Sequence, residues 1–189
     1  MLTRSQWATK YAPLAVKVSQ GSGIFPETIL SFAIVESQGK GPDGNYYPGL
    51  DLTSRKANNY FGIKAYPKWK GPVIELPTSK DSTKTSKFVV YDSVEASFQG
   101  FIDFLKRNKR YGEKGVFTSP DFQTQIIRIG AAGYEENPKA ASIKSKVAVS
   151  IKKYIDQAGG VIDDNKNLLP FFFAALVIAG FLILKKLKK

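Results

Sequence analysis

The chain has 189 residues, enough for one compact domain with a sizeable core and an appended tail. It contains neither Cys nor His, which excludes disulfides, Cys-His and Ser-His-Asp triads and the usual zinc sites, so hydrolytic chemistry has to come from carboxylates helped by Tyr or Lys. The formal net charge of +12 favours an anionic partner, whether nucleic acid, anionic lipid or the bacterial wall, although a Lys-rich surface also serves solubility alone.

Two helices are predicted at the N-terminal end of the chain. Thr3 and Gln6 have the spacing of a capping box, and the first helix then runs to about Gln20, where GSG ends it. The second helix opens at Pro26, with an acid in its first turn, and is heavily apolar up to Glu36. A carboxylate therefore ends a helix that is otherwise expected to be buried.

A loop and a small sheet are predicted to follow. The stretch Gly39–Leu52 is rich in Gly, Pro, Asp and Tyr, which is typical of a loop. Pro72–Leu76 and Lys87–Tyr91 have the composition of short strands. We expect these strands to form a small sheet inserted between helical segments.

Three further helices are predicted after the strands, at Ser93–Lys109, at Pro120–Ile129 and at Pro138–Gln157. The apolar face of the last one is expected to consist of residues at helical spacing, namely Ile143, Val147, Ile151 and Ile155. The order of elements predicts an α+β fold, with a mainly helical domain and a small β lobe over residues 1–158. A linker at 159–167 follows.

An apolar run near the C-terminal end is predicted to be a transmembrane helix. LLPFFFAALVIAGFLIL at 168–184 holds 17 residues without a charge, and KKLKK follows it directly. This length is at the short end of the about 17–25 residues that span a bilayer, but snorkelling lysines let Leu187 extend it. A buried core helix is the alternative, although the run has no polar face. We expect 168–187 to cross a lipid bilayer once, with the lysines on the cytoplasmic or interior side.

Three segments carry motifs that point to one family. They are IVESQG at 34–39, NNYFGIKA at 58–65 followed by Trp69 and Gly71, and FVVYDSVEASFQGFIDFL at 88–105 followed by RY at 110–111 and AAGYEENP at 131–138. Together they resemble glycoside hydrolase family 73, the N-acetylglucosaminidases of bacterial autolysins, flagellar rod-associated hydrolases and phage lysins. The resemblance covers residues 5–155.

The resemblance implies a lysozyme-like fold, in which a helical lobe and a strand lobe face each other across a groove for the glycan. It implies a peptidoglycan hydrolase that cleaves the β-1,4 bond after N-acetylglucosamine and uses no cofactor or metal. The expected anionic partner is then the glycan strand and not nucleic acid. Two alternatives stay open: a lytic transglycosylase, and a non-catalytic wall-binding or structural membrane protein of the same fold.

Three residues are candidates for the chemistry. Glu36 matches the family's catalytic acid, and a carboxyl that ends an apolar helix beside a groove is partly desolvated, which favours the protonated form; a solvated Glu is the alternative. Glu75 is the candidate second carboxylate, in a strand where it faces either groove or solvent, with Asp81 in reserve. Tyr134 corresponds to the family's functional Tyr near the groove, and a core Tyr is the alternative.

Five residues are candidates for binding the glycan. The resemblance implies that amides bond to sugar hydroxyls and N-acetyl groups, while aromatic rings stack on sugar faces. The candidates are Asn58, Asn59, Tyr60, Phe61 and Trp69. Trp69 is either a sugar platform or a core residue.

The route to the wall is a separate question, because MLTRSQWATKYAPLAVK lacks the apolar stretch of about 7–15 residues that an export signal needs. A membrane helix without an export signal suggests a virion protein of a membrane-containing bacteriophage, which carries the enzyme to the wall from outside. Other virion proteins are then candidate partners. The alternative location is the bacterial inner membrane.

Overall fold

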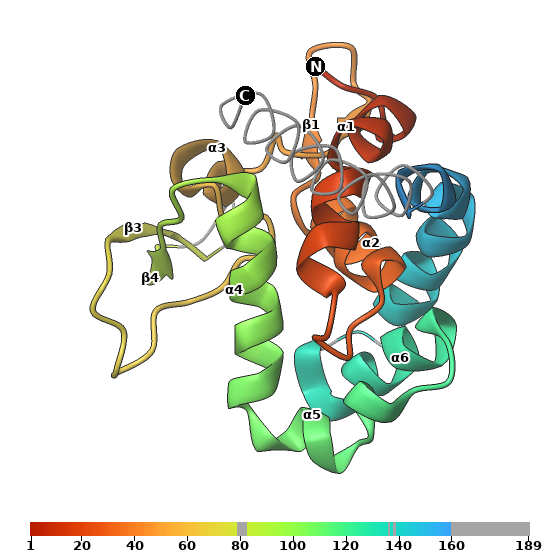
Figure 1. The fold of residues 1–189 in the computed structure, drawn as a ribbon. Helices are drawn as coiled ribbons and strands as arrows, with labels where there is room; N and C mark the ends of the chain where they lie inside the picture. Colours follow the sequence, from red (N-terminus) through yellow and green to blue (C-terminus); the bar gives the residue numbers. More distant parts are fainter. Residues whose placement is uncertain (79–82, 136, 138, 160–189) are drawn as a thin grey trace, which may run out of the picture.

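The computed structural model describes residues 1–78, 83–135, 137 and 139–159, which form a mainly helical domain with a small β lobe (Figure 1). The α+β prediction is therefore confirmed for this part of the chain. The predicted transmembrane run 168–187, the predicted linker beyond Gly159, and Asp81 lie outside the described residues. Within the described ranges, no helix has both the length and the apolar character needed to cross a membrane.

Helices α1 and α2 confirm the two predicted at the N-terminal end. Helix α1 spans Arg4–Ser19 and begins with the predicted capping box between Thr3 and Gln6. Helix α2 spans Pro26–Glu36, and every residue from 27 to 34 is buried. Helix α1 packs along α2, so α2 lies in the interior. Its last residue, Glu36, comes directly after the buried apolar stretch.

The β lobe is a hairpin of strands β3 (Val73–Pro77) and β4 (Thr85–Val89), which pair antiparallel. Both predicted strands are confirmed, with β4 beginning and ending two residues earlier than expected. The loop predicted at 39–52 also holds a two-residue ladder that the sequence did not predict, formed by β1 (Gly39–Lys40) and β2 (Tyr46–Tyr47). A short helix, α3 (Leu52–Ala57), follows.

A side-chain cap begins the long helix that follows the β lobe. Helix α4 spans Val94–Arg107 with Ser93 as its N-cap, and it stops there because Asn108, at φ −96° and ψ 103°, has left the helical region. The remaining short elements are α5 (Lys109–Glu113), η1 (Val116–Thr118), α6 (Phe122–Ile129) and η2 (Gly130–Tyr134).

The last described element is helical over 139–159 and corrects one prediction. Ile143, predicted to be on the apolar face, is 53% exposed, whereas the adjacent Lys144 is 1% exposed. The buried positions are 144, 147, 148, 151, 155 and 158, which recur at i, i+3, i+4, i+7, i+11 and i+14. The predicted positions 147, 151 and 155 are therefore confirmed on the inward face, whereas the prediction for Ile143 is wrong and the inward face begins with Lys144.

Aromatic rings form the centre of the core between α2 and α4. Phe61 stacks on Phe101 with ring centroids 4.3 Å apart and planes 5° apart, and Phe32 lies 5.2 Å from Phe101. Phe98 of α4 is also fully buried. These contacts fix α2, and with it Glu36, against the segment that follows α3.

Candidate active site

Glu36 is the last residue of α2, as the sequence predicted, and its side chain is 30% exposed. The turns before it in α2 are buried, so this carboxyl is the point at which a buried helix reaches solvent. Such a position holds the backbone of the residue rigidly while leaving one side of the carboxyl open to a ligand.

Ser37 fastens the following loop to the end of α2. Its carbonyl accepts the N–H groups of Leu50 and Asp51, at 3.1 Å each, and its hydroxyl accepts the N–H of Gly49 at 2.8 Å. A Cβ at Gly39 would lie 2.5 Å from the carbonyl carbon of Leu50, so only glycine allows the two ends of the loop to approach this closely. The residue next to Glu36 is thereby fixed from both sides.

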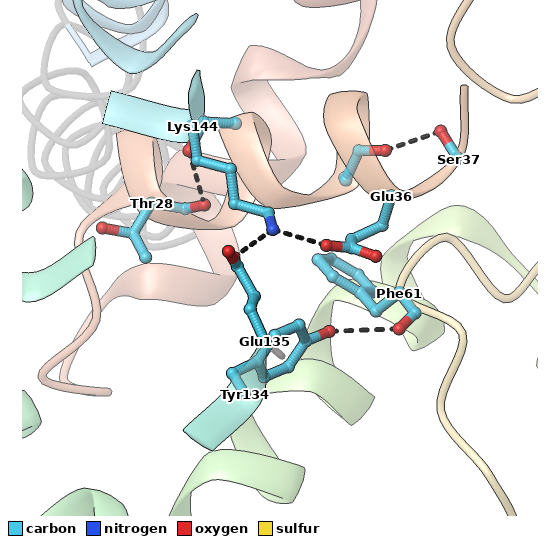
Figure 2. Close-up of polar contacts among 9 residues, drawn as sticks. Thr28, Glu36, Ser37, Phe61, Tyr134, Glu135 and Lys144 are labelled. Atoms are coloured by element: carbon cyan, nitrogen blue, oxygen red, sulfur yellow. Dashed lines mark hydrogen bonds and ion pairs between the residues drawn. The ribbon is translucent and has the colours of Figure 1, made fainter. Parts of the chain in front are cut away.

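A buried ammonium group lies against the carboxyl of Glu36. Lys144 Nζ is 2.5 Å from Glu36 Oε1 and also forms an ion pair and hydrogen bond with Oε1 of Glu135 (Figure 2). The side chains of Lys144 and Glu135 are 1% and 7% exposed. Lys144 Nζ also lies 4.6 Å from the centre of the Phe32 ring, which places it over an aromatic face. Three ionisable groups thus meet at the end of α2.

Tyr134 ends η2 beside this group. Its hydroxyl donates a hydrogen bond to the carbonyl of Phe61 at 3.0 Å (Figure 2). Its ring meets that of Phe32 edge to face, with centroids 5.1 Å apart. Burial, and then the negative charge of Glu36, raise the pKa of Tyr134 well above its ordinary value. The phenol is therefore neutral at physiological pH and acts as a hydrogen-bond donor.

Replacing Tyr134 by Phe is expected to remove one hydrogen bond and to lower the free energy of unfolding by about 1 kcal/mol. If the hydroxyl also bonds to the transition state, kcat falls about tenfold in addition, because 1.4 kcal/mol is a factor of ten. The matched control is Tyr111→Phe, which removes a phenol bonded to Arg110 instead. Denaturant unfolding and initial rates measure both effects, and equal rates for the two variants would leave Tyr134 a structural role only.

Glu75 lies in the β lobe and not in the group around Glu36. It is exposed on β3, opposite Lys87 in the register, and accepts a hydrogen bond from the hydroxyl of Thr85. Figure 1 shows the β3–β4 hairpin on one side of α4 and α2 on the other. Among the described residues, no hydrogen bond or ion pair joins Glu75 to Glu36, so its role as second carboxylate stays a prediction.

The two asparagines hold backbone together in this structure. Asn59 is fully buried, and its Nδ2 donates to the carbonyls of Ile63 and Val89 at 2.8 and 2.9 Å, while its Oδ1 accepts the N–H of Ile63 at 2.9 Å. Asn58 caps α3 in the left-handed region at φ 48° and donates to the carbonyl of Tyr91. Both amides thus donate to the backbone, and their predicted contacts with sugar stay predictions.

The predicted aromatic residues are distributed between core and surface. Tyr60 and Phe61 are 9% and 3% exposed, so their rings pack inside the protein and present no face to a sugar. Trp69 is partly buried and donates from Nε1 to the carbonyl of Pro72 at 3.1 Å. It lines a hollow of about 290 Å³ together with Tyr66, whose ring lies 3.8 Å under the guanidinium of Arg107. Trp69 is thus less buried than Tyr60 and Phe61, and its role as a sugar platform stays a prediction.

Sequence reasoning did not single out Lys144 or Glu135. Glu135 lies inside the AAGYEENP motif, but no sequence pattern distinguishes an acidic residue next to a Tyr as part of a site. A signal for Lys144 does exist, since position 144 precedes the buried positions 147, 148 and 151 by three, four and seven residues. Extending that stripe backwards finds a lysine on the inner face of the helix.

Comparisons with known proteins identify the family and the fold of the chain. The model of the glucosaminidase family, described as mannosyl-glycoprotein endo-beta-N-acetylglucosaminidase, matches residues 12–167. The peptidoglycan hydrolase FlgJ of Salmonella typhimurium is 34% identical over 156 residues, which are 80% of this chain and 47% of that protein. The chain therefore spans about half the length of this relative.

Solved structures show the same fold. The glycoside hydrolase domain of Salmonella typhimurium FlgJ superposes with a TM-score of 0.62 at 26% identity, covering 88% of this chain and 99% of that domain. The catalytic domain of the autolysin Auto from Listeria monocytogenes superposes with a TM-score of 0.61 at 16% identity, covering 82% and 89%, and this likeness is one of fold alone. The mainly helical, lysozyme-like architecture predicted from the sequence is confirmed.

Proposed function

Because the chain belongs to the glucosaminidase family, glycoside hydrolase family 73, we propose that it is a peptidoglycan hydrolase that cuts the β-1,4 bond after N-acetylglucosamine. The observation that carries the proposal is the position of Glu36, a partly exposed carboxyl at the end of a buried helix with Tyr134 and Lys144 around it. The relatives named as peptidoglycan hydrolases support the substrate class.

The proposed reaction uses Glu36 as the general acid. Its carboxyl proton passes to the glycosidic oxygen as the bond from that oxygen to C1 breaks, and the sugar becomes oxocarbenium-like. Water then adds to C1, and its proton passes to a base, for which Glu75 is the candidate. The acetamido group of an N-acetyl sugar is an alternative source of assistance, since it lies next to C1.

The products identify the reaction. Digested peptidoglycan is reduced with borohydride and analysed by mass spectrometry, and we expect chains that end in reduced N-acetylglucosamine. Anhydro-muramoyl ends would instead identify a lytic transglycosylase, which needs only one acid/base. Binding to the wall without any cleavage would identify the non-catalytic alternative, which the position of Glu75 outside the group around Glu36 favours.

Replacing Glu75 by Gln tests the second carboxylate. If Glu75 activates the water, the variant is expected to lose about 100-fold in kcat with little change in KM, because a general base acts on the chemical step. Glu113→Gln, another exposed carboxylate change, is the control and should retain full activity. A Glu75→Gln enzyme with the rate of the control would assign water activation to the substrate's own acetamido group.

We further propose that residues 168–187 hold the enzyme in a lipid bilayer. The support is the uncharged run at 168–184 followed by KKLKK, whose length and flanks suit one membrane crossing. Extraction of membranes with alkaline carbonate tests the attachment, because an integral protein stays with the lipid and a peripheral one is released.

The carrier membrane is proposed to be that of a bacteriophage particle, with the bacterial inner membrane as the alternative. A particle that contains a membrane delivers a wall hydrolase from outside the cell, and other virion proteins would be its neighbours. Gradient-purified particles should then contain the protein in their membrane fraction. Its recovery from uninfected bacterial membranes would support the alternative.

A further inference from the structure

We propose that Glu36, Lys144 and Glu135 act as one proton-holding unit, in which Lys144 and Glu135 are positioning residues that set the protonation of Glu36. The unit is defined by Lys144 Nζ, which contacts Oε1 of both carboxylates (Figure 2). The consequence for activity rests on the proposed function of Glu36 as general acid, while the coupling of the three groups rests on geometry alone.

Burial makes the charge of Lys144 depend on its partners. Its side chain is 1% exposed, and an ammonium group taken out of water is stable only when carboxylates or other acceptors surround it. Here two carboxylate oxygens and the face of Phe32 surround it. The lysine therefore draws Glu36 and Glu135 to a common point and holds each in one orientation.

The unit carries a surplus negative charge when all three groups are ionised, because two carboxylates face one ammonium. Glu135 is 7% exposed, and its Oε2 is buried without a hydrogen-bond partner among the described residues. An unpartnered carboxylate oxygen in such a place is costly, whereas one bound proton makes the unit neutral. The ionisation states of the three groups are therefore coupled through Lys144 Nζ.

Exposure decides which of the three groups can give a proton to a substrate. Glu36 is 30% exposed, whereas Lys144 and Glu135 are buried, so only Glu36 reaches a substrate. Among the described residues, the other titratable group at the site is Tyr134, from η2, and its strongly raised pKa keeps it neutral. Glu135 and Lys144 thus place charges of opposite sign beside the one carboxyl of the unit that a substrate can reach.

Variants of the two buried residues should move the pH dependence in opposite directions. Activity is lost at high pH when the general acid loses its proton. Glu135→Gln removes the surplus charge and leaves Glu36 paired with the ammonium, so this loss should occur at lower pH, by about one unit or more. Lys144→Met removes the ammonium and leaves two like charges together, so the loss should occur at higher pH by a similar amount.

Two further variants separate this coupling from a purely structural role. Lys144→Arg keeps the positive charge. It should keep the alkaline limb of the pH–rate profile, where activity is lost at high pH, close to that of the unchanged protein. The double change of Glu135→Gln and Lys144→Met removes both charges. It should return the pH at which activity is lost towards that of the unchanged protein. A structural role alone predicts that all variants lose stability and rate while the limb stays in place, so thermal melts by circular dichroism accompany each profile.

The decisive experiment measures these pH–rate profiles on the full chain in detergent, together with the ¹³C titration of the Glu36 carboxyl, assigned by Glu36→Gln. Opposite displacements in the two single variants are the expected result. Displacements in the same direction, or none, overturn the inference. If the protein shows no hydrolysis at any pH, the proposed function fails, and the ¹³C titration still tests the coupling.

Discussion

Replacing Glu36 by Gln is expected to abolish the clearing of purified peptidoglycan in a zymogram and to lower kcat by about 10²–10⁴-fold. The amide is close in shape but has no proton of suitable acidity to give to the leaving oxygen. Lys144 keeps its ion pair with Glu135 in this variant, so the fold should persist and the melting temperature should stay near that of the unchanged protein. Initial rates on labelled peptidoglycan measure the loss.

The control for this prediction is Gln38→Glu, which places a carboxylate two residues beyond Glu36 on the other side of the fixed Ser37. It changes the charge near the site without removing the acid and should leave most of the activity. A Glu36→Gln protein that clears peptidoglycan as fast as the unchanged one would refute the assignment of Glu36 as general acid.

The largest effect on stability is expected from Asn59→Ala. The change leaves the carbonyl of Val89 and the N–H of Ile63 without their buried side-chain partner, while the carbonyl of Ile63 loses one of two donors and keeps the N–H of Val89. Each unsatisfied group costs about 1–3 kcal/mol, and water entering the space left by the amide recovers part of it, so we expect the free energy of unfolding to fall by roughly 3 kcal/mol or more. Urea unfolding followed by circular dichroism provides the measurement.

Asn45→Ala is the matched control, because this exposed amide bonds only locally to Asp43, and its loss should change stability by less than about 0.5 kcal/mol. The comparison also distinguishes two roles of Asn59. A variant with normal stability and a raised KM would show that the amide binds sugar, as the sequence had suggested, and that the bonds to the backbone contribute little.

The sequence predicted best where the local pattern alone determines the structure. The capping box at Thr3, the proline that opens α2 and the apolar run up to Glu36 each act within a few residues, and all are confirmed. The position of the candidate acid follows from that run, because the end of a buried helix is also the end of its apolar sequence. The strands β3 and β4 were predicted for a similar reason, from their composition.

The surroundings of Glu36 could not be predicted in the same way, because they come from distant parts of the chain. Lys144 reaches Glu36, and Glu135 reaches Lys144, only through the packing of distant segments, and one residue of the predicted apolar face, Ile143, lies outward while Lys144 lies inward. Motif residues such as Asn59 and Phe61 raised a second difficulty. The sequence does not distinguish an amide or aromatic ring that binds sugar from one that supports the backbone. Only the burial of the side chain in the folded protein separates the two roles.

The fastening of the loop at Ser37 has a consequence for enzyme engineering. Its two ends are fixed by Ser37, Gly39, Gly49 and Leu50, while the residues from 42 to 46 between them are exposed. This stretch can therefore be exchanged or randomised without disturbing the helix that carries the acid. A library confined to 42–46 would vary the exposed end of the loop that follows Glu36, and selection on walls of different chemistry would test whether this loop contributes to specificity.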